Sequence, residues 1–193
     1  QGMNAQSGGE NSVTAAGHLA ISTVAAAAAT SGSGMSADSG GSNSVTGDSV
    51  TITATGAAKA NYGMNALYGG TNSISGVDGD VTIQAVDSQD AYGVRAYWGG
   101  ENTIENVSGA ITIEARSTTK NAYGMLSQKG SNTITGGDNA RLDVSAVSEN
   151  GRATGVTSSN GYNGDNSGTF TTITLGDNAE VNFSAATGTG NAY

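Results

Sequence analysis

The feature that most constrains this chain is a short phrase that recurs at a nearly fixed interval. A glycine followed by methionine or valine returns after 32, 29, 30, 31 and 31 residues. The six glycines are Gly2, Gly34, Gly63, Gly93, Gly124 and Gly155. Self-similarity with such a period is typical of one structural unit stacked repeatedly, and not of a globule around a single core.

Each copy contains short runs in which apolar and polar residues alternate. In residues 81–85, Val, Ile and Ala alternate with Thr and Gln. A period of two with β-branched residues predicts half-buried strands, whereas a helix would need apolar residues three and four positions apart. The first run of the same copy is residues 62–66. Tyr62, Met64 and Ala66 alternate with the other residues of this run, which predicts that all three face the same side of a strand.

Glycine-rich corners separate three such runs in each copy. Glycine suits corners because it reaches positive φ at little steric cost. We therefore predict an all-β fold, a parallel β-solenoid with about six coils of about 30 residues and three short strands per coil. Residues 1–193 form a single array in this interpretation. The chain begins and stops inside the repeated phrase, so we expect a segment of a longer array or a unit that stacks end to end.

A column of asparagines fits stacked coils. In five copies an asparagine lies two positions before a Val or Ile. It therefore has the parity of an apolar residue and is predicted to point inward at a corner. Stacked amides can each donate to one neighbour and accept from the other, so we predict an asparagine ladder. The alternative is that these residues only form turns. The column consists of Asn11, Asn43, Asn72, Asn102 and Asn132.

Composition excludes several functions. The net charge is −9 with only 7 Lys plus Arg, so binding to nucleic acid or to an anionic membrane surface is not expected. No apolar run is long enough to predict membrane insertion. The chain has no Cys, which excludes disulfides and thiolate metal sites.

The sequence predicts no catalytic, cofactor or metal site. His18 is the only histidine, and the carboxylates are scattered, so we expect no enzyme. Loose calcium binding is an alternative, but we favour solvated acids in turns. The acids considered for calcium are Asp78, Asp80, Asp87 and Asp90.

The strongest candidate for recognition is an aromatic pair on neighbouring coils. Tyr68 and Trp98 occupy one register, and Tyr97 and Arg95 lie beside them in the sequence. Exposed rings beside a cation predict contact with a sugar ring or with a side chain of a partner. The alternative, which parity favours, is that Tyr68 and Trp98 fold inward and fill a corner of the coil.

An insertion marks the sixth copy. Residues 160–168 interrupt the repeat and include Tyr162. Insertions in single repeats often lie on a binding face, so we predict a protruding loop there and count Tyr162 among the contact residues for a partner or glycan.

Three phrases carry a resemblance to a known family. Residues 91–96, 99–104 and 109–115 resemble passenger segments of bacterial autotransporter adhesins, and the likeness extends through copies that are rich in Gly, Ala, Ser, Thr and Asn. The resemblance implies a right-handed parallel β-helix outside a Gram-negative cell. No binding residue of the family can be placed on this chain by motif.

Two functions follow as expectations. The first is an extracellular adhesive or stalk segment on the bacterial cell surface that contacts a host cell or a glycan. The alternative is a subunit of an extracellular filament in which copies of the chain add strands end to end.

Overall fold

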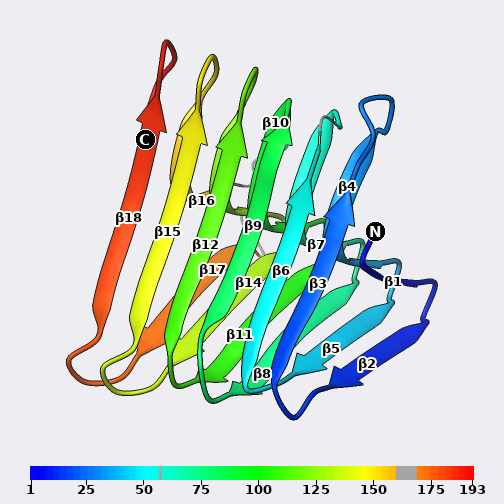
Figure 1. Cartoon of the computed structure of the whole chain (residues 1–193), viewed down its shortest axis with the longest axis vertical. Helices are drawn as coiled ribbons and strands as arrows, with labels where there is room; N and C mark the ends of the chain where they lie inside the picture. Colours follow the sequence, from blue (N-terminus) through cyan, green and yellow to red (C-terminus); the bar gives the residue numbers. More distant parts are fainter. Residues whose placement is uncertain (57, 160–168) are drawn as a thin grey trace.

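The chain folds into three parallel β-sheets that wind around a narrow core (Figure 1). The computed structural model describes residues 1–56, 58–159 and 169–193, and the side chains of residues 87 and 88 lie outside that description. Every coil contributes one strand to each sheet, and each sheet has six strands. The prediction of an all-β solenoid with three strands per coil is confirmed. The first and sixth strands of a sheet are five turns apart.

The strands follow one another in chain order around each coil. The first sheet contains β1 (Met3–Gln6), β4 (Ser31–Asp38), β7 (Ala60–Leu67), β10 (Asp90–Tyr97), β13 (Ala122–Gln128) and β16 (Ala153–Ser159). The second contains β2 (Glu10–Thr14), β5 (Ser42–Thr46), β8 (Thr71–Val77), β11 (Glu101–Val107), β14 (Ser131–Gly136) and β17 (Phe170–Leu175). The third contains β3 (His18–Val24), β6 (Ser49–Thr55), β9 (Val81–Ser88), β12 (Ala110–Ser117), β15 (Arg141–Ser148) and β18 (Glu180–Thr187).

Equivalent residues of successive coils lie directly beside one another. Ile104 pairs with Ile74 on one side and with Ile134 on the other, as the repeat predicts. The two chain ends lie at opposite ends of the stack (Figure 1). Because parallel neighbours are about 4.8 Å apart, any residue type repeated in one register forms a continuous column along the stack.

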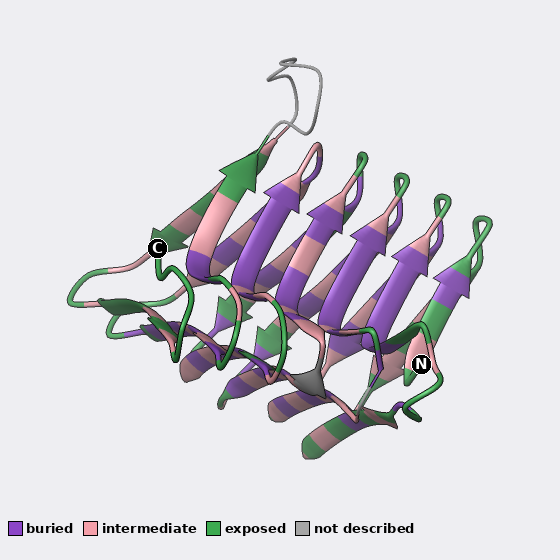
Figure 2. Ribbon diagram, turned by 90° about the horizontal axis from the view of Figure 1, so that it is seen from above, coloured by how far each residue is buried: buried purple, intermediate pink, exposed green. Residues whose placement is uncertain are grey.

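The core consists of such columns. Strand β6 alternates strictly between half-buried and buried residues, with Val50, Ile52 and Ala54 inside. One continuous cluster of Ile, Val, Leu and Met extends along the stack. A second cluster consists of two alanine columns, one on the third sheet and one on the first, beside the corner that joins them. Figure 2 shows buried strands in the middle coils and exposed ones in the outermost coils. Large side chains on one side and alanine on the other leave a narrow cross-section.

The recurring glycine is required because coils approach closely there. A Cβ on Gly93 would lie 2.6 Å from the carbonyl oxygen of Gly124 and would also clash with Cγ2 of Ile113. Gly63 and Gly34 face the same two obstacles, a glycine carbonyl of the next coil and a core isoleucine. Only hydrogen fits between these groups, so the phrase marks a steric limit that recurs in the first five coils.

The same glycine overturns one prediction from parity. Met64 and Ala66 are fully buried, but Tyr62 is only half-buried and lies on the outer face of the first sheet. The Cβ position of Gly63 points at Ile83 in the core, and the next residue, Met64, is in the core as well. Two successive residues therefore face inward, and the alternation changes phase at the glycine.

The asparagine ladder is present. Asn43, Asn72, Asn102 and Asn132 are buried, and each Nδ2 group of the first four members donates to the Oδ1 atom of the next coil. The four N···O distances lie between 2.9 and 3.0 Å. Each Nδ2 also donates to a backbone carbonyl of the first sheet, which for Asn102 is that of Arg95. The ladder thus fixes the corner between the first and second sheets and satisfies polar groups that water cannot reach.

The predicted loop at residues 160–168, with Tyr162, lies outside the described residues.

Candidate binding surface

The outer face of the first sheet carries most of the aromatic residues of the chain. On β10 the half-buried residues of this face are Asp90, at the start of the strand, and Tyr92, Arg95 and Tyr97, and the turn that follows adds Trp98. Rings and cations of the neighbouring coils extend this face along the stack. We call this set the aromatic surface; it consists of Tyr62, Tyr68, Tyr92, Arg95, Tyr97, Trp98, Tyr123 and Lys129.

Three tyrosines of one column stack face to face. The ring centroids of Tyr62 and Tyr92 are 5.0 Å apart with an interplanar angle of 13°, and those of Tyr92 and Tyr123 are 5.2 Å apart at 6°. The register dictates this arrangement because the three residues are direct partners in neighbouring strands. Because the rings stack at the strand spacing, both faces of the Tyr92 ring are covered, and the three rings form a ridge along the stack.

Arg95 packs between this ridge and the turn. Its guanidinium carbon is 5.2 Å from the ring centroid of Tyr62, 5.4 Å from that of Tyr92 and 4.6 Å from that of Tyr97. Nη1 donates to the hydroxyl of Tyr62 at 3.0 Å, and the buried Nε has no hydrogen-bond partner among the described residues. Cation–π contacts on three sides hold the guanidinium in place.

The turn after the strand presents the two most exposed rings of the surface. Tyr68 is 57% exposed and Trp98 is 47% exposed. Trp98 contacts Tyr97 edge to face at 5.9 Å, and the ammonium group of Lys129 lies 4.3 Å from the Trp98 ring centroid. The prediction that Tyr68 and Trp98 fold inward and fill the corner is wrong.

Turn geometry explains the outward direction. Tyr68 has a φ of 47° and Gly69 a φ of 78°, and the N–H of Gly70 donates to the carbonyl of Leu67 at 2.8 Å. Two successive residues with positive φ and this hydrogen bond define a type I′ turn. Strand parity does not continue through such a turn, so the side chain leaves the core.

A bulky ring in this turn is unusual. Left-handed backbone disfavours large side chains, and such conformations gather at functional sites. The equivalent positions of the first two coils hold Ser7 and Ser39, whose φ angles are 53° and 52°. Tyr68 and Trp98 therefore occupy a position that holds serine in the first two coils and Lys129 in the fifth, so the rings are not needed to make the turn.

The structure brings together most of the residues predicted from the sequence. Tyr68, Tyr97, Trp98 and Arg95 lie in one continuous surface. The tyrosine column and the contribution of Lys129 were not predicted from the sequence. The sequence does contain a signal, because Tyr precedes the glycine of the phrase at residues 62, 92 and 123, but strand parity predicts that this residue points inward.

A recess lies beside the aromatic surface on the outer face of β13 and β16. It encloses about 260 Å³. It is lined by Tyr92, Tyr123, Leu126, Gln128, Arg152, Thr157 and Ser159. Leu126 and Thr157 continue the column of Arg95, and Gln128 and Ser159 continue that of Tyr97, so the recess opens where long side chains give way to shorter ones.

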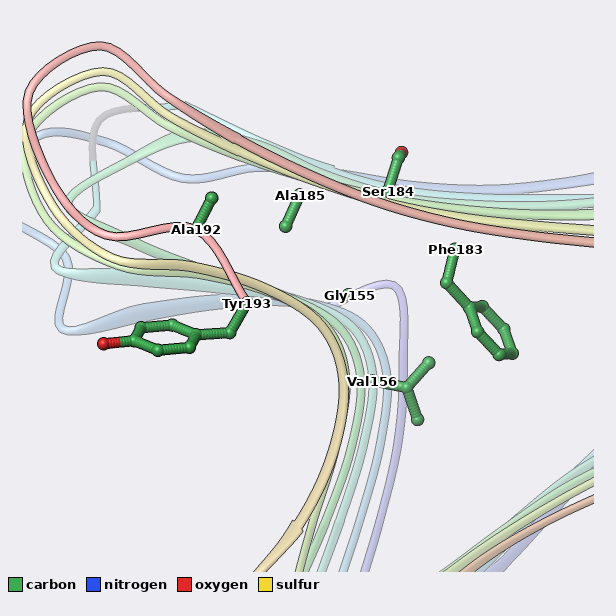
Figure 3. Close-up of a pocket in the computed structure, with 7 residues that line it drawn as sticks. All are labelled: Gly155, Val156, Phe183, Ser184, Ala185, Ala192 and Tyr193. Atoms are coloured by element: carbon green, nitrogen blue, oxygen red, sulfur yellow. The ribbon is translucent and has the colours of Figure 1, made fainter.

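A larger hollow of about 410 Å³ at the last coil has a different origin (Figure 3). Val156 and Phe183, which line it, are register partners of the core residues Met125 and Val144. The hollow is therefore the interior of the outermost coil and follows from the stacking.

Burial changes the acidity of the stacked tyrosines. Burial raises the pKa of Tyr62, and the positive charge of Arg95 opposes this shift. The pKa of Tyr92 is raised mainly by burial and secondly by the negative charge of Asp90. The folded state thus favours the neutral phenol, and the unfolded state releases the proton first as pH rises.

We therefore expect the free energy of unfolding to decline as pH rises above about 10, the usual pKa of tyrosine. Below that pH the contribution of these phenols to stability is complete. Urea unfolding between about pH 8 and about pH 11 measures the slope, and Tyr92→Phe should make it shallower because the variant lacks one such phenol. An equal slope in the wild type and the variant contradicts this assignment.

Nothing in the described chain gathers into a metal site, since no three His, Asp or Glu side chains lie together there. The Nδ1 atom of His18 forms a hydrogen bond with the Ser49 hydroxyl oxygen at 2.8 Å on the surface. Of the acids considered for calcium, Asp80 accepts a hydrogen bond from the backbone N–H of Ala110, as expected for an acid in a turn.

No family model, no curated protein and no solved structure matches this chain. Among the described residues there is also no helix with the length and apolar character needed to span a membrane.

Proposed function

We propose that this chain is an extracellular, surface-displayed β-solenoid segment of a bacterial adhesin, and that the aromatic surface makes the adhesive contact with a glycan or a host cell. The solenoid acts as a rigid support in this proposal. Its columns place side chains at a fixed spacing, so a binding surface needs no further folding when a partner arrives.

One observation carries the proposal, namely the exposed rings of Tyr68 and Trp98 in turns that serine forms in other coils. Exposed aromatic rings that the fold does not need are best explained by contact with a partner. Rings with Arg95 and Lys129 beside them supply both an apolar face and hydrogen-bond donors, which a sugar or a mixed protein surface can use.

The test is the double variant Tyr68→Ser and Trp98→Ser, which copies the turns at Ser7 and Ser39. Binding of the purified chain to a glycan array and to cultured epithelial cells is expected to fall at least about 10-fold, as for the loss of aromatic hot-spot residues. Its free energy of unfolding should change by less than about 1 kcal/mol because both sites are on the surface.

Phe170→Ser provides the matched control. Phe170 is 56% exposed on β17 and is the register partner of Ser131, so the variant also replaces an exposed ring by the serine of a neighbouring coil. Binding should be unchanged in this control. Equal loss in both variants, or unchanged binding in the double variant, would contradict the proposed role.

The alternative function, a subunit of a self-assembling filament, remains a prediction from the sequence. Electron microscopy of the purified chain distinguishes it from the adhesive function, because regular fibres support the filament and short separate rods support the adhesin.

A further inference from the structure

The cations of this acidic protein are distributed unevenly. Of the 7 Lys plus Arg, Arg95 and Lys129 lie against rings of the aromatic surface, and the guanidinium of Arg152 lies 4.6 Å from the ring centroid of Tyr193. No carboxylate of the described residues is within 4.0 Å of these three cations, whereas Arg116 and Arg141 form ion pairs on the third sheet. These three cations therefore have no ion-pair partner among the described residues, while the carboxylate of Asp90 lies on the same sheet near Tyr92.

Arg152 places part of this charge at the recess. Its Nε atom donates to the hydroxyl of Thr154 at 3.1 Å, and the residue lines the recess together with Tyr92 and Tyr123. This hydrogen bond and the contact with Tyr193 restrict the guanidinium. A planar guanidinium that is already oriented is suited to bind a carboxylate through two hydrogen bonds.

The remaining lining of the recess is uncharged, with Leu126 as its one aliphatic residue. Gln128, Thr157 and Ser159 contribute an amide and two hydroxyls, and the tyrosines contribute aromatic surface. Such groups can exchange hydrogen bonds with the hydroxyls of a sugar. The volume of about 260 Å³ is slightly below the range of about 300–1,000 Å³ of most small-molecule sites, which suits one ring of a longer ligand.

We infer that the recess and the adjacent aromatic surface bind a saccharide that carries carboxylate groups, with Arg152 holding one carboxylate. The inference rests on the proposed adhesive function and specifies its ligand class. Arg152 and Arg95 belong to coils two steps apart, roughly 10 Å along the stack at the strand spacing. An acidic oligosaccharide that lies along the first sheet would therefore meet Arg152 at the recess and reach Arg95 only on the adjacent aromatic surface.

A nucleic acid fits this surface less well than a saccharide does. The continuous charge of a phosphate backbone requires a basic stripe, and the chain as a whole carries a charge of −9. Separate carboxylates on a sugar chain need only local cations, because each one is neutralised at its own position.

Binding of defined oligosaccharides tests the inference by isothermal titration calorimetry. Tetragalacturonate and 3′-sialyllactose are the acidic probes, and methyl-esterified tetragalacturonate and lactose are their neutral counterparts. We expect at least one acidic probe to bind at least about 10-fold more tightly than its neutral counterpart, the effect of one charge-assisted hydrogen-bonded pair. The two acidic probes also distinguish a uronate from a sialate ligand, and either result supports the inference.

Two variants locate the site. Arg152→Gln removes an exposed cation of the recess and should weaken binding of the acidic probe at least about 10-fold. Arg116→Gln makes the same change in net charge on the third sheet and should alter binding less than about 2-fold. Thermal unfolding of both variants checks that the fold is retained.

Equal affinity for acidic and neutral probes, no binding of either acidic probe, or equal effects of the two arginine variants would overturn the inference. The outcome is separable from that of the proposed function. If the serine double variant loses binding to cells while neither acidic probe binds, the adhesive function stands and the ligand class is wrong. If the acidic probes bind but cells do not, the saccharide site stands and the adhesive function is wrong.

Discussion

Replacing Asn72 by alanine is expected to lower the free energy of unfolding by about 4 kcal/mol. The Nδ2 group of Asn72 donates to the backbone carbonyl of Asn65 and to Oδ1 of Asn102, and its Oδ1 accepts from Asn43. The side chain is fully buried, so water cannot replace these bonds. Each buried polar group left without a partner costs about 1–3 kcal/mol, and the variant interrupts the ladder at its centre.

Asn11→Ala is the matched control because Asn11 is the end member of the same ladder. It donates to Asn43 and to the carbonyl of Asn4 but is partly exposed, so water can bind to the groups that it leaves. We expect a loss of about 1 kcal/mol. Chemical denaturation of both variants measures the difference. Equal losses would show that the ladder does not act as a buried network.

The second large effect is expected for Gly93→Ala. The added methyl group would meet the carbonyl oxygen of Gly124 and the side chain of Ile113, and neither neighbour has free space to move into within a packed stack of coils. Overpacking of this kind costs about 1–3 kcal/mol, and a clash with backbone adds to it. We therefore expect a loss of about 3 kcal/mol or more in the free energy of unfolding.

Gly17→Ala tests whether the effect is specific to the repeated phrase. A Cβ at Gly17 would meet no heavy atom of the described residues within 4 Å. The control should unfold within about 0.5 kcal/mol of the wild type. A similar loss in both variants would instead point to a general effect of replacing glycine, and the close contact between coils would not be its cause.

The ladder and the glycine have a consequence for the binding surface. Asn102 holds the backbone carbonyl of Arg95, and Gly93 lies one residue after the stacked Tyr92. The interior columns therefore fix the strand that carries Arg95, Tyr97 and the turn with Trp98. We expect variants of the ladder to weaken binding only as far as they disturb β10, because none of the ladder side chains belongs to the aromatic surface.

Much of the site could be predicted, but its orientation could not. The register of Tyr68 with Trp98, and their proximity to Arg95, follow from the repeat alone, because identical spacing places equivalent residues side by side. The direction of a side chain depends on every φ angle before it. The left-handed turn at Tyr68 and the change of phase at Gly63 each shift the alternation, and a rule of period two contains neither.

The sequence by itself determined the stack. A period of about 31 residues, runs of alternating polarity and an asparagine at one register in five of the six coils leave a parallel β-solenoid as the arrangement that satisfies both burial and hydrogen bonding. The tertiary structure alone decided which face carries the aromatic surface, because that depends on turn angles and on contacts between residues about 30 positions apart. Stacking of Tyr62 on Tyr92, packing of Arg95 between rings and the recess at Arg152 exist only once neighbouring coils are in contact.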